Sequence, residues 1–378
     1  MYFVEKTKGI NFVKNFDYYL FFAVIVLSLV GLMAVSSAVS TMSSGSRTMT
    51  VQAISLILGV VLSIVISTID YKDFKILGFI FYGLSVGLLV LVLLIGTGDS
   101  LGSRSWLNIK GISFQPSEIS KIAFVIVLSV FLERIYDGQD GRKNNILKLI
   151  AFSVVPIGLV VAQRDYGTTM VFLFMLSVMI FICGIPYRYI LSLIGTFALS
   201  TPFIWFFVLN EARKNRLRVF LDPELDPQGA GFNVLRSRLA IGSGQIWGKG
   251  LYEGIQTQNS MVPVKESDFI FSVIGEELGF IGTITVVLLV LFILIRCLYV
   301  AKKSRDTYGS FLVVGMLSMM GIHFVENMGM TIGILPVTGI PLPFVSAGGS
   351  AMITNYIALG VILSVSMRRR RNIWATDK

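Results

Sequence analysis

The sequence predicts an all-α polytopic membrane protein with ten transmembrane helices and a large, partly helical extracellular loop between the seventh and eighth. Of its 378 residues, 54% are hydrophobic and only 14% are charged, whereas soluble domains contain about 25% charged residues. Ten apolar runs each approach the ~20 residues that a helix needs to cross a bilayer. Lys and Arg gather on one side of these runs. Most of the chain is therefore expected to face lipid.

The expected helices follow one another through short connections, except at one place. They are expected over residues 17–38, 49–69, 75–96, 117–136, 146–163, 167–184, 188–209, 268–298, 308–333 and 350–367. In the long interval, residues 210–267, turn signals alternate with short apolar runs. We expect this stretch to be partly helical and to fold over the bundle, so that residues 1–378 form a single integral membrane domain.

The distribution of cations predicts the orientation. Of the 32 Lys and Arg residues, 19 lie on the side that carries both termini, 5 lie on the opposite side outside the long loop, and 8 lie within that loop. Short cytoplasmic loops hold the positive excess, whereas long loops are translocated whatever their charge. Both termini are therefore expected in the cytoplasm. The net charge of +10 is explained by membrane orientation, and no nucleic-acid partner is expected.

The few cysteines and histidines exclude two kinds of site. The chain contains only Cys183, Cys297 and His323, all within apolar runs. A disulfide framework and the usual Cys/His zinc clusters are therefore excluded. A lone histidine in an apolar helix is expected to be a core residue.

Asp268 is the first candidate site residue, because it stands where the long loop meets an apolar helix. Partial burial at such a boundary raises the pKa of a carboxylate and makes it a better base near neutral pH. The alternative is a structural role, in which Ser267 or Asp268 caps the helix. Glu276 and Glu277, two turns further on, are expected to pair with Arg or Lys inside the bundle.

Two further motifs with acidic residues lie at the starts of expected helices. In FQPSEISK, Glu118 and Lys121 share one helix face and are expected to form an internal ion pair, although Lys121 could instead receive an anionic headgroup. In QRDYGT, Asp165 is expected to cap the following helix.

The segment GILPVTGIPLPFVSAGGS predicts irregular backbone after the ninth expected helix, because it contains three prolines and several glycines. Such backbone persists at membrane depth only where protein or a watery cavity covers it. We expect the segment to line a cavity, with the N–H groups of Gly348, Gly349 and Ser350 facing an anion. A re-entrant plug without a ligand is the alternative.

Four long blocks of the sequence carry a resemblance to a known family. They read RSWLNIKGISFQPSEISK, RVFLDPELDPQGAGFNVLRSRLAIGSGQIWGKG, QTQNSMVPVKESDFIFSVIGEELGFIG and GMTIGILPVTGIPLPFVSAGGS. In this order, over nearly the whole chain, they resemble the shape, elongation, division and sporulation (SEDS) family, the group of RodA and FtsW. The segment GIQTQ followed by VP is more similar to the RodA branch.

The resemblance implies a peptidoglycan glycosyltransferase of the bacterial cytoplasmic membrane that polymerises lipid II at the outer face during cell elongation or shape maintenance. It implies a class B penicillin-binding protein, a transpeptidase, as partner. The family's catalytic aspartate corresponds to Asp268. Its other polar positions correspond to Arg104, Glu118, Lys121, Lys249 and the loop that contains Ser346, Gly348, Gly349 and Ser350.

The implied reaction releases a lipid diphosphate, whose charge requires cations. Arg104, Lys121, Lys249 and Arg216 are the candidates among the side chains, and a divalent cation such as Mg²⁺ is a further candidate. Two other functions fit the same features: a lipid II flippase, and a noncatalytic scaffold for a penicillin-binding protein.

The chain departs from the family pattern near the expected site. Arg164 stands in QRDYGT where a proline is usual. VKES precedes Asp268 where an acidic residue, a histidine and a threonine are common. Ala347 replaces an aromatic residue. The aspartate is retained, so the departures bear on substrate specificity and on the level of activity.

Overall fold

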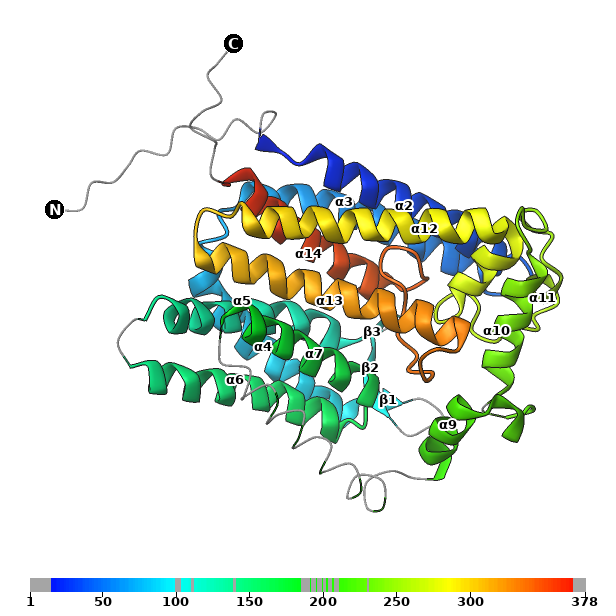
Figure 1. Cartoon of the computed structure of the whole chain (residues 1–378), viewed down its shortest axis with the longest axis horizontal. Coiled ribbons are helices and arrows are strands. Elements are labelled where there is room, and N and C mark those ends of the chain that lie inside the picture. The colour runs from blue at the N-terminus through cyan, green and yellow to red at the C-terminus, as the bar shows by residue number, and fades with distance from the viewer. Residues whose placement is uncertain are drawn as a thin grey trace, which may run out of the picture.

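The computed structural model describes residues 15–98, 103–109, 112–138, 141–184, 211–229 and 231–369, with isolated positions between 185 and 210. This part of the chain is mostly helical (Figure 1). The helix expected over 188–209 lies outside the described residues.

The other expected helices are present, with ends within four residues of their expected positions. They are α2 (Tyr18–Ala38), α3 (Gly45–Thr68), α4 (Phe74–Ile95), α5 (Pro116–Tyr136), α6 (Arg142–Ala162), α7 (Tyr166–Ile182), α12 (Ile270–Lys302), α13 (Thr307–Ile332) and α14 (Gly349–Met367).

Seven of the described helices are long and apolar enough to cross a membrane: α2, α3, α4, α6, α12, α13 and α14. Two of the nine helices named above are not in this set: α7 has only 17 residues, and α5 carries four charged side chains. The chain is therefore a multi-pass helical membrane protein.

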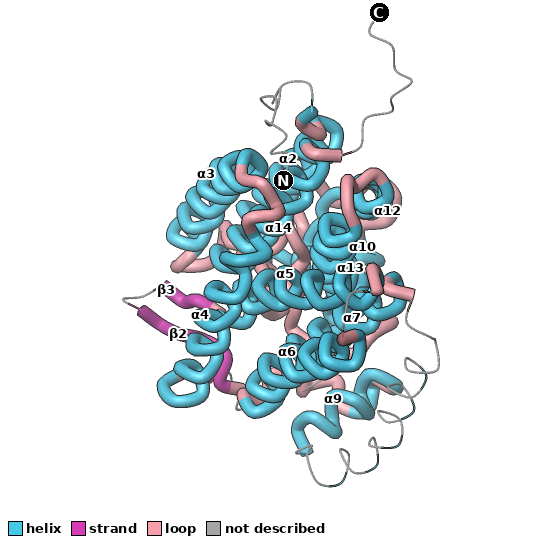
Figure 2. The backbone as a smooth tube through the Cα atoms, turned by 90° about the vertical axis from the view of Figure 1, so that its left-hand side faces the viewer, coloured by secondary structure: helices cyan, strands magenta, loops and turns pink. Residues whose placement is uncertain are grey.

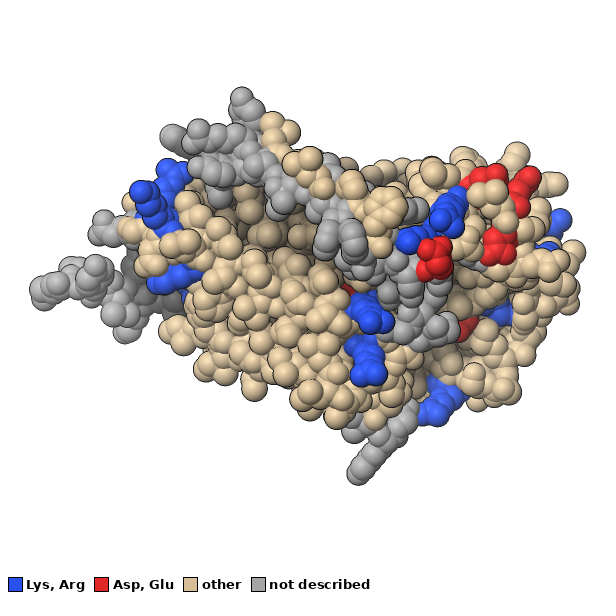
Figure 3. Space-filling model, turned by 90° about the horizontal axis from the view of Figure 1, so that it is seen from below, with Lys and Arg blue, Asp and Glu red and all other residues tan. Residues whose placement is uncertain are grey.

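The core of the bundle consists of α5, α13 and α14, which lie among the other helices when the bundle is viewed along its axis (Figure 2). Most residues of α5 are buried, and 78% of the apolar window of α14 is buried, against 22% in α3. A helix that is apolar all round belongs in a protein core or in lipid. The outer helices accordingly expose large apolar side chains, and Figure 3 shows a broad area without charged side chains between the cations at its left end and those near its middle.

Ion pairs join the helices at one end of the bundle. The Asp17 carboxylate accepts hydrogen bonds from the Arg296 guanidinium at 3.0 and 3.1 Å, and it lies 3.9 Å from the guanidinium of Arg369. Since Asp17 precedes α2 and Arg369 follows α14, the first and last described helices begin and end on the same side. If both ends of the chain lie on one side of the membrane, the helices from α2 to α14 cross it an even number of times.

The opposite end is covered by the segment that links α7 to α12. Its described elements are α9 (Glu211–Leu221), the short 3-10 helix η2 (Pro223–Leu225), α10 (Phe232–Ser243) and α11 (Ile255–Gln258), which gather at the right-hand end in Figure 1. α10 packs against α12 and α13, and α11 contacts α2. The segment is thus a folded part of the protein.

Residues 245–249 of this segment pack against α12 at a kink in that helix. Gly279 has φ +64°, and a Cβ atom there would lie 2.3 Å from the amide nitrogen of Gly248. The Phe280 N–H donates to the Gln245 carbonyl at 2.8 Å, and the Lys249 N–H donates to the Glu276 carbonyl at 3.0 Å. Glycine permits both the positive φ and the close approach, and the same reason applies to Gly248, whose φ is +84° and where a Cβ atom would lie 2.1 Å from the Glu277 carbonyl oxygen.

A small antiparallel sheet departs from the all-α expectation. It contains β1 (Thr97–Gly98), β2 (Arg104–Ile109) and β3 (Ile112–Phe114), in that order. Along β2 the exposed Arg104, Trp106 and Asn108 alternate with the buried Ser105 and Leu107. This period of two is the strand signal, but it runs for only a few residues beside long apolar helices.

Candidate active site

Asp268 lies just before α12, at the end of the bundle covered by α9, α10 and α11. The Asn327 side chain of α13 fixes its backbone, donating to the Asp268 carbonyl at 2.9 Å and to the Ile340 carbonyl at 2.8 Å. Asn327 is fully buried. A single amide therefore ties the start of α12 to the loop that follows α13. Sequence reasoning did not select Asn327, because a buried polar residue in an apolar helix does not reveal its partners.

The Asp268 side chain is half-buried and faces the same loop. Its Oδ1 accepts a hydrogen bond from the Ser267 hydroxyl at 3.0 Å. A Cβ atom on Gly339, whose φ is +75°, would lie 3.4 Å from Oδ2. Burial raises the pKa of Asp268; the Ser267 hydrogen bond lowers it, the Glu266 charge raises it and the Arg216 charge lowers it. The balance is a raised pKa, which suits a general base.

The alternative role of Ser267 or Asp268 as a helix cap is wrong. Phe269 occupies the N-cap position of α12, with no side-chain hydrogen bond to the first turn. The Ser267 hydroxyl is already used, because it donates to the neighbouring carboxylate. The Asp268 side chain consequently remains available for chemistry.

Arg216 of α9 acts electrostatically on Asp268. Its guanidinium donates to the Val337 carbonyl at 3.5 Å. A narrow cavity next to it is lined by Arg216, Val219, Phe220, Val234, Gly333, Leu335, Pro336 and Val337. The cavity has a volume of only about 10 Å³, and it lies between the loop after α13 and the segment that links α7 to α12. Among the cations considered from the sequence, Arg216 is the one that acts electrostatically on Asp268.

The end of the proline-rich loop fixes the chain before Asp268. The Ser346 hydroxyl donates to the Ser267 carbonyl at 2.6 Å and accepts from the Leu342 N–H at 2.8 Å. The Ala347 N–H donates to the Glu266 carbonyl at 2.8 Å. Ser346 therefore holds the backbone beside Asp268.

Gln52 of α3 anchors this loop from the other side. Its side-chain amide donates to the Ser346 carbonyl at 2.9 Å, and its Oε1 accepts the Gly348 N–H at 3.1 Å. The Gly348 N–H is therefore engaged within the protein. Gly349 and Ser350 form the first turn of α14, where N–H groups have no partner within the helix.

Glu118 and Lys121 form the expected internal ion pair. The Lys121 ammonium lies 2.7 Å from Glu118 Oε1 and 3.0 Å from His323 Nε2, and the Lys121 side chain is only 1% exposed. The ammonium thus has two partners inside the bundle. His323, expected as a core residue, is buried and joins α13 to this pair.

Asp165 caps α7 as expected. Its carboxylate accepts from the Thr168 N–H at 3.0 Å and the Thr168 hydroxyl at 2.9 Å. Burial raises the pKa of Asp165, and the Thr168 hydrogen bonds lower it. Arg164 has φ +60°, a value that the proline ring excludes. The local backbone of this chain therefore differs from the proline-containing turn that the resemblance implies.

Arg104 and Lys249, two basic residues expected in the site, are exposed and lie away from the loop around Asp268. Arg104 lies on β2, where its backbone N–H donates to the Gln163 carbonyl at 3.0 Å. Lys249 bonds through its backbone to Glu276, eight residues from Asp268, or about 12 Å along a helix. No described contact brings either side chain to Asp268.

Glu276 and Glu277 were expected to pair with Arg or Lys, but within the described residues neither forms a direct ion pair; their charges act on the buried Lys265 from a distance. The Glu276 carboxylate accepts from the Gln256 and Thr257 N–H groups at 2.7 and 2.9 Å. Glu277 accepts from the Ser37 hydroxyl at 2.6 Å. The short α11 directs its free N–H groups at Glu276, and such donors stabilise a carboxylate without a direct ion pair.

The VKES departure is accommodated by a buried lysine. The Lys265 ammonium donates to the Thr257 carbonyl at 2.5 Å and to the Thr41 hydroxyl at 3.1 Å. Burial lowers the pKa of Lys265. The ammonium consequently braces the covering segment against the end of α2.

A second carboxylate, that of Glu266, acts on Asp268. Its Oε2 is buried without a hydrogen-bond partner. Within the part of the chain that the structure describes, no group of three His, Cys, Asp or Glu residues is arranged to hold a metal. Mg²⁺ commonly uses one or two carboxylates together with water and substrate phosphates, so the unpartnered Glu266 oxygen is compatible with such an ion.

The fold and the site define a multi-pass helical membrane protein with a half-buried acid at one end of its bundle. The chain belongs to the FtsW, RodA and SpoVE family, whose model, described as "Cell cycle protein", matches residues 15–371. The SEDS resemblance is thereby confirmed.

Named relatives and solved structures support the same family assignment. The chain is 34% identical over 313 residues to the peptidoglycan glycosyltransferase MrdB of Escherichia coli K12, covering 83% of this chain and 84% of that protein. It is 32% identical over 370 residues to the probable peptidoglycan glycosyltransferase FtsW of Geobacter metallireducens, covering 95% and 96%.

Among solved structures, the crystal structure of Thermus thermophilus RodA matches with a TM-score of 0.70 and 26% identity, over 94% of this chain and 98% of that one. A chain from a study of "Structural coordination of polymerization and crosslinking by a peptidoglycan synthase complex" matches with a TM-score of 0.77 and 28% identity, over 93% and 97%.

Proposed function

We propose that this protein is a peptidoglycan glycosyltransferase that polymerises lipid II, with Asp268 as the general base. The observation that carries the proposal is the environment of Asp268: a half-buried carboxylate of raised pKa, fixed through its backbone by Asn327 and lying near the charge of Arg216. The relatives named as peptidoglycan glycosyltransferases support the same reaction class.

In the proposed reaction, two lipid-linked sugars meet beside Asp268. The carboxylate takes the proton of the acceptor's 4-hydroxyl while that oxygen forms a bond to the anomeric carbon of the donor. The bond from that carbon to the lipid diphosphate breaks, and the diphosphate leaves with the electron pair. Arg216 would stabilise the developing negative charge, and its electrostatic effect on Asp268 supports this role.

A divalent cation such as Mg²⁺ would be held by Glu266, beside Asp268, and would supply charge neutralisation to the diphosphate. The buried, unpartnered Glu266 Oε2 supports this part of the proposal. Arg104, Glu118, Lys121 and Lys249 remain candidates for substrate recognition, as do Gly349 and Ser350 at the start of α14.

The proposed setting is the bacterial cytoplasmic membrane, with ten crossings, both termini in the cytoplasm and Asp268 at the outer face. The ion pairs of Asp17 with Arg296 and Arg369 support an even number of crossings. A class B penicillin-binding protein is the proposed partner, supported by the structural similarity to a chain of a synthase complex. A role in cell elongation or shape maintenance belongs to the same proposal.

The decisive experiment measures glycan polymerisation from labelled lipid II by the purified protein, with and without its partner. Asp268→Asn is expected to reduce the rate by about 10²–10⁴-fold, the usual contribution of a general base. Asp222→Asn is the matched control, since Asp222 caps η2 in the same covering segment and asparagine caps equally well. Polymerisation at the wild-type rate by Asp268→Asn would exclude the proposed base.

The same experiment distinguishes the two other functions. A flippase would move lipid II across liposomes and would keep doing so in Asp268→Asn. A noncatalytic scaffold would leave lipid II unpolymerised with or without the partner.

A further inference from the structure

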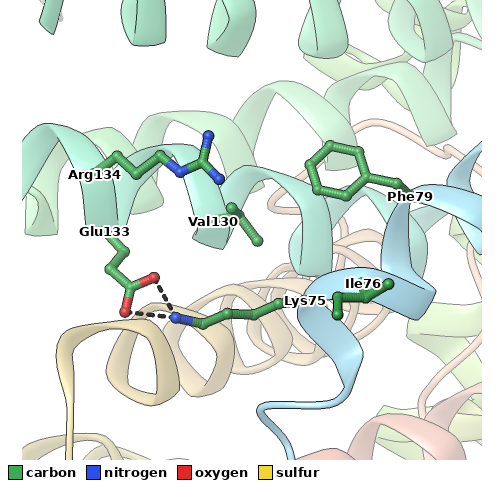
Figure 4. A pocket seen from close by; sticks show the side chains of 6 residues that line it. All are labelled: Lys75, Ile76, Phe79, Val130, Glu133 and Arg134. Carbon is green, nitrogen blue, oxygen red and sulfur yellow. Dashed lines mark hydrogen bonds and ion pairs between the residues drawn. The ribbon is translucent and has the colours of Figure 1, made fainter. Parts of the chain in front are cut away.

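A second cavity lies at the end of the bundle opposite Asp268. Its volume is about 590 Å³, and it lies between the start of α4 and the end of α5 (Figure 4). The proposed reaction uses none of its lining side chains, which are Lys75, Ile76 and Phe79 of α4 and Val130, Glu133 and Arg134 of α5.

The lining changes from charged to apolar along the helix axes. Lys75 lies in the first turn of α4, and Arg134 lies in the last turn of α5. Phe79 and Val130 lie one turn deeper, about 6 Å further along the bundle. Ile76, which also lines the cavity, is 77% exposed on a helix that is apolar enough to cross a membrane. The cavity thus has a polar rim at the end of the bundle and an apolar floor toward its middle.

The rim carries an excess of positive charge. The Lys75 ammonium lies 2.6 Å from one oxygen of Glu133 and 2.8 Å from the other, and it lies 4.6 Å from the centre of the Tyr308 ring. Arg134 makes no hydrogen bond or ion pair with any residue that the structure describes. One cation is therefore neutralised and one is left over. A free guanidinium can hold two phosphate oxygens at once.

We propose that this cavity binds one anionic phospholipid, with its phosphate on Arg134 and one acyl chain along Phe79 and Val130. The volume falls within the range of small-molecule sites, about 300–1,000 Å³. A free phosphate ion would use the rim but not the apolar floor, whereas a phospholipid matches both. Anionic lipids of a cytoplasmic leaflet are attracted by basic residues at helix ends, and the cations at this end of the bundle agree with that leaflet.

Lipid binding to the purified full-length protein tests the proposal. Phosphatidylglycerol and phosphatidylcholine with identical acyl chains are titrated separately and followed by native mass spectrometry. The wild type is expected to bind phosphatidylglycerol at least fivefold more tightly. Arg134→Gln is expected to weaken phosphatidylglycerol binding about fivefold and to leave phosphatidylcholine binding unchanged. Arg134→Lys is expected to retain most of the preference.

Two variants sharpen the test. Glu133→Gln frees the Lys75 ammonium and is expected to tighten phosphatidylglycerol binding. Lys302→Gln removes a cation at the same end, but on α12, which packs against α2 and α13; it is expected to change neither affinity. Equal affinities for the two lipids in the wild type, equal losses in Arg134→Gln and Lys302→Gln, or displacement by millimolar inorganic phosphate would each overturn the proposal.

The outcome of the lipid-binding test does not depend on the proposed reaction at Asp268. Lipid binding is measured without lipid II, so a protein that fails to polymerise glycan can still show the phosphatidylglycerol preference. Loss of the preference likewise leaves the proposed general base untouched.

Discussion

Replacing Asn327 with alanine tests whether the position of Asp268 depends on a neighbouring helix. In the structure, one side-chain amide of α13 donates to two backbone carbonyls, those of Asp268 and Ile340. These bonds join the start of α12 to the proline-rich loop. Alanine removes both donors and leaves two carbonyl groups without these partners.

The expected loss of stability follows from those two hydrogen bonds. Each contributes about 0.5–1.5 kcal/mol in proteins, and hydrogen bonds between membrane helices average ~0.6 kcal/mol. Together they amount to about 1–3 kcal/mol. The effect on catalysis is expected to be larger, because a displacement of ~1 Å at a reacting group can cost about 10²-fold in rate.

The assay combines thermal unfolding in detergent with glycan polymerisation. Asn355→Ala is the matched control, because Asn355 is also a buried asparagine but donates within its own helix, to Ala351. Asn327→Ala is expected to lose about 10²-fold in rate at a temperature where it remains folded, whereas Asn355→Ala keeps most of its activity. Similar rates in the two variants would show that Asn327 does not position Asp268.

Three further predictions concern the pH profile, a buried charge and the kink. Burial raises the pKa of Asp268 and Arg216 lowers it, so Arg216→Gln should move the acidic limb of the pH–rate profile to higher pH; an unmoved limb contradicts this electrostatic role. Lys121→Met leaves a buried carboxylate unpaired and should destabilise the fold by about 3–5 kcal/mol, measured by thermal unfolding. Gly279→Ala forces a Cβ atom into backbone at positive φ and should lower the unfolding temperature, whereas Gly83→Ala, with open space around it, should not; equal temperatures would refute the packing argument.

Long-range periodicity and composition made most of the fold predictable. The apolar runs that predicted α2, α4 and α14 each produce a helix with ends close to the expected residues. Membrane helices satisfy their backbone hydrogen bonds internally, so their existence depends on local sequence. The short sheet was missed because its alternation covers only β2, and residues 188–209 lie outside the described part of the chain.

The site was only partly predictable, because proximity between distant residues depends on packing. Asp268 was selected from its position at a helix boundary, and the pairing of Glu118 with Lys121 followed from their i, i+3 spacing. Nothing local indicated that Gln52 would hold the loop before α14, or that Asn327 would hold Asp268. These contacts join residues that are 59 to 296 positions apart.

The sequence by itself determined the lipid-facing character of the chain, the positions of its described long helices and the identity of the acidic residue at a loop boundary, because hydrophobic length and charge act locally. Only the tertiary structure decided which cation approaches that acid. The charge of Arg216 acts on it because α9 holds Arg216 against the loop after α13, at the Val337 carbonyl, whereas Lys121 is enclosed by Glu118 and His323. Electrostatic interactions depend on separation in space, and the order of residues along the chain does not fix that separation.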